Sequence, residues 1–188
     1  MNMSAAQVLG AIYVVSEIGL AINKRAAAGA AHVQDRGSLT LLWVVIAASV
    51  TLAFNLAYLL PAAAMYAGPV LGILGIVLFA AGLASRWYAI VRLGRFFTVN
   101  VAIAADHRLI DTGPYRLVRH PSYTGALMAF LGLGLCLANW ASLAAIVVPI
   151  LLVFLRRMHI EEAALLQAFG DQYRDYMRRT RRLIPAVY

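Results

Sequence analysis

Long apolar runs separated by short polar segments dominate the hydrophobicity pattern of this 188-residue chain. Five of the runs approach the length of about 20 residues that a helix needs to cross a bilayer. Most charged residues lie between the runs rather than inside them. The pattern predicts an all-α, polytopic membrane protein with about five transmembrane helices, at residues 5–22, 39–60, 69–91, 123–138 and 140–155.

The distribution of basic residues indicates how these helices are oriented. Fifteen of the 16 lysines and arginines fall in three segments, residues 23–37, 92–119 and 156–188. With five spans, all three segments lie on one side of the membrane, and an excess of positive charge is typical of the cytoplasmic side. We therefore predict an N-terminus outside and a C-terminus in the cytoplasm, because four or six spans would scatter the arginines over both faces.

Composition supports a membrane protein and excludes some other classes. Apolar residues make up 63% of the chain and charged residues 13%, whereas soluble domains have about 45–50% and about 25%. The net charge of +8 is typical of proteins that bind nucleic acid or an anionic membrane surface, and the high hydropathy favours the membrane. Cys136 is the single cysteine, so it can form no intrachain disulfide, and we expect it to be buried and inert, with no metal site.

The chain is expected to form a single membrane domain, residues 1–188, with three spans in residues 1–91 and the chemistry in residues 92–188. Its first residues lack the basic stretch of a cleavable signal peptide, so the first span is expected to be retained. The abundance of alanine and arginine is typical of a GC-rich bacterial genome, which predicts the bacterial inner membrane. The oligomeric state cannot be read from the sequence.

Two charged residues lie inside predicted spans. Glu17 precedes Lys24 by seven residues, and Arg86 precedes Arg92 by six. Both spans run toward the cytoplasm, so both charges lie about 9–10 Å deep at 1.5 Å per residue. Charges at such depth are rare and are usually paired or functional. We favour a Glu17–Arg86 ion pair; in the alternatives, one of the two points into an active cavity, or Arg86 extends to the interface.

Small residues and the C-terminal segment carry further structural signals. Glycines in the third and fourth spans are expected to let these helices pack closely; they are Gly68, Gly72 and Gly75, and Gly125, Gly132 and Gly134. Residues 161–182 have apolar positions at steps of three and four, which predicts a cytoplasmic amphipathic helix on the bilayer or over the cytoplasmic loops. Gly170 weakens that helix by about 1 kcal/mol, so a break there is expected.

The densest polar cluster is the segment 113–125, GPYRLVRHPSYTG. Pro121 suits the first turn of a helix because proline has no N–H to leave unpaired there. The free N–H groups of such a helix end can hold a carboxylate, and Arg119 and His120 add donors beside it. The same residue types also anchor helices at the membrane interface, and composition alone leaves the two interpretations open.

A second cluster follows the fifth predicted span. Arg157 and Glu161 are four residues apart, so they share one face of a helix. Considered without any other information, this spacing favours an ordinary helix ion pair over a functional site.

Together the two clusters resemble the signature of the isoprenylcysteine carboxyl methyltransferase family, whose wider group includes membrane phospholipid methyltransferases. The first half reads GPYRxVRHPxYxG at residues 113–125. The second half is carried by Glu161, Glu162, Leu165, Phe169, Gly170, Tyr173, Tyr176, Arg182 and Pro185. The resemblance covers roughly residues 92–186, and two linked motifs in the right order are far more specific than either alone.

The resemblance implies S-adenosylmethionine as methyl donor and a lipophilic, membrane-embedded acceptor, in the first instance a carboxylate of the isoprenylcysteine type, methylated at the cytoplasmic face. Arg157 and Glu161 match the family's essential arginine and glutamate. The expected cofactor-binding residues are Tyr115, Arg119, His120, Pro121, Tyr123, Gly125 and Glu162. Membrane lipids are expected partners and nucleic acid is not.

Chemical roles follow for several of these side chains. His120 and Arg119 suit the carboxylate of the cofactor's methionine part, Glu162 suits its ammonium group, and Gly125 would let the ligand press on backbone. Arg157 could clamp an acceptor carboxylate, with Glu161 holding the arginine. Glycines of the fourth span could line a slot for a lipid tail.

The sequence is also compatible with a different function and with other methyl acceptors. The alternative function is a non-catalytic membrane protein or carrier with a degenerate methyltransferase site. The acceptor could also be a small isoprenoid or fatty acid, a lipid amine or a thiol, so the sequence leaves O-, N- and S-methylation open.

Overall fold

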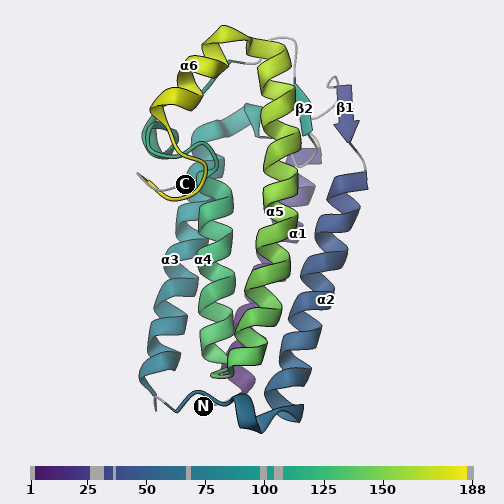
Figure 1. Ribbon diagram of the computed structural model, residues 1–188, viewed down its shortest axis with the longest axis vertical. Coiled ribbons are helices and arrows are strands. Elements are labelled where there is room, and N and C mark those ends of the chain that lie inside the picture. Colours follow the sequence, from purple (N-terminus) through teal and green to yellow (C-terminus); the bar gives the residue numbers. More distant parts are fainter. Residues whose placement is uncertain are drawn as a thin grey trace.

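The computed structural model describes residues 3–25, 32–35, 37–66, 69–97, 101–103 and 108–185. Five long helices run side by side in alternating directions, and a short sixth helix lies across one end of them (Figure 1). The helices are α1 (Met3–Arg25), α2 (Gly37–Leu59), α3 (Val70–Leu93), α4 (Pro121–Cys136), α5 (Trp140–Phe169) and α6 (Asp171–Arg179). Three 3-10 turns join them, at Pro61–Ala63, Gly94–Phe96 and Gly113–Arg116.

The fold is helical as predicted, with one small addition. Two short strands, β1 (His32–Asp35) and β2 (Val101–Ile103), form an antiparallel ladder at the same end as α6. The prediction of an all-α chain missed this ladder because strands of three and four residues are too short to show a period-two pattern.

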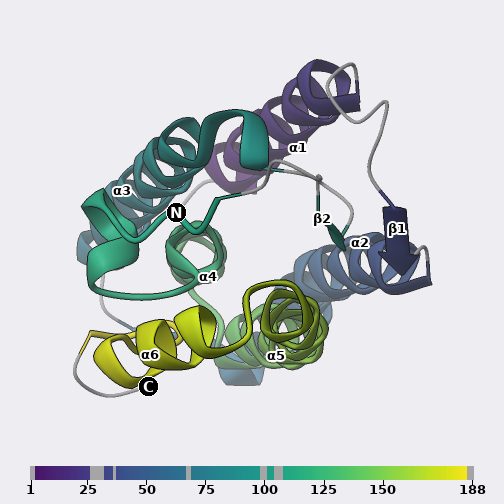
Figure 2. The same ribbon diagram turned by 90° about the horizontal axis from the view of Figure 1, so that it is seen from above.

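Helix α4 occupies the middle of the bundle (Figure 2). It packs mainly against α3 and also against α5 and α1, while α2 packs against α5. Because most of its side chains are covered by other helices, α4 does not have to match the thickness of a bilayer by itself. This explains why 16 residues are enough for it, although they extend over only about 24 Å at 1.5 Å per residue.

Three of the predicted spans are helices long and apolar enough to cross a membrane, namely α2, α3 and α5. Large apolar side chains on their outer faces are exposed, including Val44, Leu74 and Leu152, as expected for surfaces that contact lipid tails. The protein is therefore an integral membrane protein. Helices α1 and α4 coincide with the other two predicted spans and contain shorter apolar segments, at Ala5–Leu20 and Pro121–Cys136.

Glycines bring α3 and α4 together at two levels. A Cβ atom added to Gly125 would lie 2.5 Å from the backbone nitrogen of Arg86, and one on Gly82 would lie 2.5 Å from that of Ala129. Gly75 and Gly132 meet in the same way further along the helices. The packing role predicted for the glycines is confirmed for Gly75, Gly125 and Gly132, whereas Gly68 lies outside the described residues.

The lipid slot predicted along the glycines of α4 is wrong. The free side of Gly132 is filled by the backbone of α3, and that of Gly134 by Leu143 of α5. A slot would need open space at these positions, and neighbouring helices occupy it instead. Cys136 is buried in the same interface, as expected, with its thiol 3.7 Å from the carbonyl oxygen of Gly72.

The C-terminal part differs from the prediction in where one helix ends. Helix α5 continues without interruption from the predicted fifth span to Phe169, so the first half of the amphipathic segment predicted over residues 161–182 belongs to α5. Only residues 171–179 form a separate C-terminal helix. Within residues 161–169, Glu162 and Ala164 are buried, and α5 contacts α6. The break at Gly170 is confirmed: its φ of +51° is a conformation that glycine adopts readily, and α6 then begins at Asp171.

Candidate active site

A cavity opens at the capped end of the bundle, between α4, α5, α6 and the upper parts of α1 and α2. The space between its lining residues, including the part that is open to the surroundings, amounts to about 1340 Å³. Its wall on the α6 side carries Tyr115, Arg119, His120, Glu161, Tyr173 and Tyr176. Its deeper wall is mostly apolar and aromatic, with Tyr13, Leu20, Leu39, Leu42, Trp43, Ile46 and Phe154.

Arg157 lies where the two walls meet and is held from three helices. Its Nε donates to the hydroxyl oxygen of Tyr123 on α4 at 2.9 Å, and its NH1 donates to Oγ of Ser38 on α2 at 3.1 Å. A carboxylate oxygen of Glu161, one turn further along α5, lies 3.3 Å from Nε. Arg157 keeps only 3% of its full exposure. Its guanidinium is therefore held in one orientation, and water screens its charge little.

Tyr123 and Glu161 complete this cluster. The Tyr123 hydroxyl donates to Oε1 of Glu161 at 2.5 Å, and its ring meets Phe154 edge-on with centroids 4.9 Å apart. About a quarter of the Glu161 side chain is exposed, which leaves the carboxylate facing the cavity. The arrangement places a fixed positive charge and a partly accessible negative charge side by side at the cavity wall.

Glu162, the next residue, is buried and surrounded by positive groups. Its Oε1 accepts from Nε of Arg119 at 2.9 Å and lies 3.2 Å from Nε2 of His120. Its Oε2 accepts from NH2 of Arg182 at 2.7 Å. The donors of this chain already surround the carboxylate, and the contact of Glu162 with the ammonium group of a cofactor stays a prediction. Glu162 joins α5 to the start of α4 and to the C-terminal segment.

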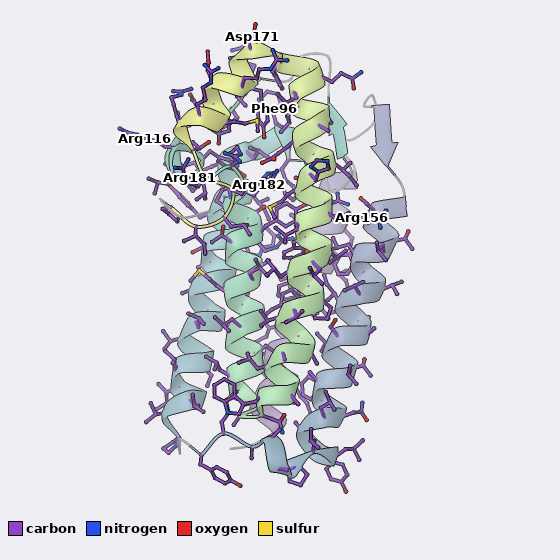
Figure 3. All side chains as sticks on the ribbon, viewed as in Figure 1. Phe96, Arg116, Arg156, Asp171, Arg181 and Arg182 are labelled. Carbon is purple, nitrogen blue, oxygen red and sulfur yellow. The ribbon has the colours of Figure 1, made fainter. Side chains whose placement is uncertain are left out.

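Arg119 ties the C-terminal segment over the cavity. Its NH1 donates to the carbonyl oxygens of Met177 and Thr180, at 3.2 and 2.6 Å. Backbone N–H groups of Arg119 and His120 also donate to the carbonyls of Arg181 and Arg182. Figure 3 shows Arg181 and Arg182 beside the upper end of α4. This cross-link explains how residues far apart in the sequence form one wall.

The tyrosines of α6 close the cavity from above. The Tyr176 hydroxyl donates to the carbonyl oxygen of Tyr115 at 2.7 Å, and the Tyr115 hydroxyl donates to that of Ala89 at 3.3 Å. Tyr173 is buried next to them, and its hydroxyl has no hydrogen-bond partner in the described part of the chain. Burial raises the pKa of all three phenols above the usual range, so each stays a neutral hydroxyl.

The predicted pair of charges inside the spans is confirmed. Nε and NH2 of Arg86 donate to the two carboxylate oxygens of Glu17, at 2.7 and 2.8 Å, and NH1 donates to the carbonyl oxygen of Ser122 at 3.3 Å. Glu17, Arg86 and Ser122 also line the cavity. The pair therefore attaches α1 to α3 and, through Ser122, to the first turn of α4, from which Tyr123 projects.

The predicted site residues divide into two groups. Tyr115, Arg119, His120, Tyr123, Arg157 and Glu161 line the cavity. Pro121, Gly125 and Glu162 are absent from its lining. Pro121 starts α4 as predicted. The free side of Gly125 faces the backbone of α3, so close helix packing is the reason for a glycine there, and its contact with a cofactor stays a prediction.

Sequence reasoning missed several residues that line the cavity or hold its lining residues in place. Ser38, which holds Arg157, and Tyr13 and Trp43, which line the deeper wall, come from the first half of the chain, where no motif stands out. Tyr173 and Tyr176 belong to the second half of the methyltransferase signature, but the sequence does not indicate a binding role for either of them. Within the described residues no three histidine, cysteine or acidic side chains gather as ligands of a metal ion.

Comparison with known proteins supports the resemblance. A family model described as phospholipid methyltransferase matches residues 70–172, more than half of the chain. A probable protein-S-isoprenylcysteine O-methyltransferase of Oryza sativa is 34% identical over 115 residues, covering 60% of each chain. Protein-S-isoprenylcysteine O-methyltransferase B of Arabidopsis thaliana is 36% identical over 60% of this chain and 58% of its own. The chain thus spans about three fifths of the length of these relatives.

A solved structure shows the same fold. The eukaryotic intramembrane Ras methyltransferase, isoprenylcysteine carboxyl methyltransferase, matches with a TM-score of 0.65 and 29% identity, over 81% of this chain and 54% of that chain. The match of the family model extends from the start of α3 to the first residues of α6 and so includes Arg119, Tyr123, Arg157 and Glu161. The chain belongs to the phospholipid methyltransferase family of integral membrane proteins.

Proposed function

We propose that this protein is an S-adenosylmethionine-dependent carboxyl O-methyltransferase that acts on a lipophilic acceptor at the cytoplasmic face of the membrane. The observation that carries the proposal is the cluster of Arg157, Tyr123 and Glu161 at the junction of a polar and an apolar wall of one cavity. A lipid with a terminal carboxylate needs both kinds of surface, and the fixed guanidinium charge at their junction suits the carboxylate.

The polar end of the cavity fits the methyl donor. The donor combines a flat adenine ring, a ribose and a zwitterionic methionine part joined at a sulfonium cation. Tyrosine faces attract cations and stack on flat rings, and Tyr115, Tyr123 and Tyr176 line this region. The unpartnered hydroxyl of Tyr173 offers an additional hydrogen bond. Arg119 and His120 provide positive or donor groups for a carboxylate, although Arg119 also binds Glu162.

The donor supplies an electrophilic methyl group when bound, and the residues of this chain then act by binding and orientation. Methyl transfer to a carboxylate is an in-line displacement in which no proton has to be removed, so positioning and electrostatics supply the rate enhancement. Arg157 attracts and orients the acceptor carboxylate, and Tyr123, Ser38 and Glu161 keep its guanidinium in place. The partly exposed carboxylate of Glu161 favours a sulfonium cation nearby.

The deeper wall is suited to a lipid tail. Leu39, Leu42, Trp43 and Ile46 line it from α2, and Tyr13 and Leu20 from α1. In the described part of the chain, α1 packs mainly against α3 and α4, and α2 mainly against α5. A tail that enters between α1 and α2 would bury apolar surface while its carboxylate stays at Arg157. This makes an acceptor of the isoprenylcysteine type the first choice.

The membrane topology is proposed as five spans with the cavity facing the cytoplasm. Arg116, Arg156, Arg181 and Arg182 lie toward the capped end of the bundle (Figure 3), as the positive-inside rule requires of the cytoplasmic side. Cysteines introduced at Tyr66, beyond α2, and at Asp171 test this topology in a Cys136→Ala background. A thiol reagent that does not cross the membrane should label position 66 from outside and position 171 only after the membrane is opened.

The acceptor site is tested with an S-prenylated cysteine and its carboxamide, which differ in the charge that Arg157 would bind. The wild-type protein should bind the carboxylate more tightly than the amide, and Arg157→Ala should lose this discrimination and reduce methylation by about 100-fold. Arg157→Lys keeps the charge but not the planar geometry, so its activity should be intermediate. If Arg157→Ala prefers the carboxylate over the amide as strongly as the wild-type protein does, Arg157 does not bind the acceptor carboxylate.

A further inference from the structure

Tyr173, in the cavity wall, has a buried hydroxyl without a hydrogen-bond partner among the described residues. Tyr173 is exposed to 1% of its full area, and its hydroxyl makes no hydrogen bond to any described residue. An unpaired buried hydroxyl is unfavourable, and such groups usually find a partner in the protein, a water molecule or a ligand. Because Tyr173 lines the cavity, the missing partner can be supplied there.

The neighbouring contacts show that this situation is particular to Tyr173. One helical turn later, the hydroxyl of Tyr176 donates to the carbonyl of Tyr115. Arg119 binds the carbonyls of Met177 and Thr180 at the end of α6. The second half of α6 is therefore attached to residues 115–119, which precede α4. Its first half follows the turn at Gly170 and carries Tyr173, a lining residue whose buried hydroxyl has no partner among the described residues.

We propose that the Tyr173 hydroxyl is a binding group for the nucleoside part of the methyl donor. This inference rests on the proposed function and adds a binding role for one further residue, which lies on α6. The nucleoside carries neutral donors and acceptors on a flat ring and a ribose, which suit a phenol flanked by the tyrosine rings of the same wall. The charged methionine part suits the charged groups on the α4 and α5 side instead, where His120 and Glu161 lie.

The proposal distinguishes ligand binding from a structural role. Tyr173→Phe removes a hydroxyl that has no partner among the described residues, so the melting temperature without ligand should stay the same or rise. Tyr176→Phe removes a hydrogen bond that the protein itself makes, so its melting temperature without ligand should fall. A purely structural role for both hydroxyls would lower both temperatures.

The test is calorimetric titration of the purified full-length protein in detergent with S-adenosylhomocysteine and with methylthioadenosine, which has the nucleoside but not the amino-acid part. Tyr173→Phe should weaken binding of both compounds by the same factor, about 3- to 10-fold, as expected for one neutral hydrogen bond. Tyr66→Phe is the matched control, because Tyr66 is 92% exposed at the other end of the bundle.

Each outcome bears on the inference. Equal affinity of wild-type protein and Tyr173→Phe for both compounds would overturn it while leaving the proposed function intact. A loss of affinity for S-adenosylhomocysteine alone would place the hydroxyl at the amino-acid part and would also overturn the assignment to the nucleoside. If the wild-type protein binds neither compound, the proposed function and this inference are both wrong.

Discussion

The ion pair between Glu17 and Arg86 gives the sharpest prediction about stability. Both side chains are nearly buried, with exposures of 7% and 11%, and the guanidinium donates to both carboxylate oxygens. Glu17→Gln removes the negative charge and leaves Arg86 buried with the carbonyl of Ser122. Removing one partner of a buried pair costs about 3–5 kcal/mol because the other charge is left uncompensated.

A double-mutant cycle separates this effect from the loss of either side chain. Arg86→Gln alone should lower the free energy of unfolding by a similar amount. The double variant Glu17→Gln/Arg86→Gln retains two neutral polar groups that can pair, so we expect a loss at least about 2 kcal/mol smaller than the sum of the single losses. The assay is reversible unfolding in mixed micelles, followed by the circular dichroism of the helices.

A neutral contact between the same two helices is the control. The indole N–H of Trp87 on α3 donates to Oγ of Ser16 on α1 at 2.7 Å. Ser16→Ala removes this bond without changing a charge and should cost about 1 kcal/mol. Losses of Glu17→Gln and Arg86→Gln that add within about 0.5 kcal/mol would refute the coupling and with it the account of how α1 is attached.

Three further predictions concern the helix interface and the cavity wall. Gly125→Ala should lower the free energy of unfolding by about 1–3 kcal/mol because its methyl group meets the α3 backbone. Gly10 has open space around it, so Gly10→Ala should not have this effect. Equal effects of the two substitutions would contradict the packing account. Ser38→Ala should reduce kcat/KM about 10-fold by loosening Arg157, with Ser38→Thr restoring most of it; rates unchanged in Ser38→Ala would exclude this positioning role. Glu162→Gln should lower the melting temperature strongly, since three cationic or donor groups lose their carboxylate; an unchanged melting temperature would show that these contacts contribute little.

Features with a simple geometric basis could be predicted from the sequence. Glu17 and Arg86 lie at similar distances from the ends of helices that run in the same direction, so their similar depth follows from the helical rise. Pro121 at the first turn of α4 and the break at Gly170 follow from the backbone preferences of proline and glycine. Arg157 and Glu161 are four residues apart, and their contact requires only that α5 continue past the predicted end of the span.

Features that depend on tertiary packing could not be predicted. Glu162 differs from Glu161 by one position, and only the folded chain shows that Arg119, His120 and Arg182 surround it while its neighbour faces the cavity. Ser38 reaches Arg157 across 119 positions of sequence, with no motif to mark it. The continuation of α5 to Phe169 could not be predicted either, because a hydropathy pattern marks the apolar stretch that suits lipid and not the point where the helix itself ends.

The central claim is methyl transfer from S-adenosylmethionine to a carboxylate, and the nature of the methylated product tests it most directly. Purified protein would be incubated with an S-prenylated cysteine and S-adenosylmethionine labelled in its methyl group, and the lipid product would then be treated with mild base. The account predicts that the label is released as volatile methanol, as from a methyl ester. A labelled product that survives base, as a methylated amine or thioether does, or a complete lack of labelled product, would contradict it.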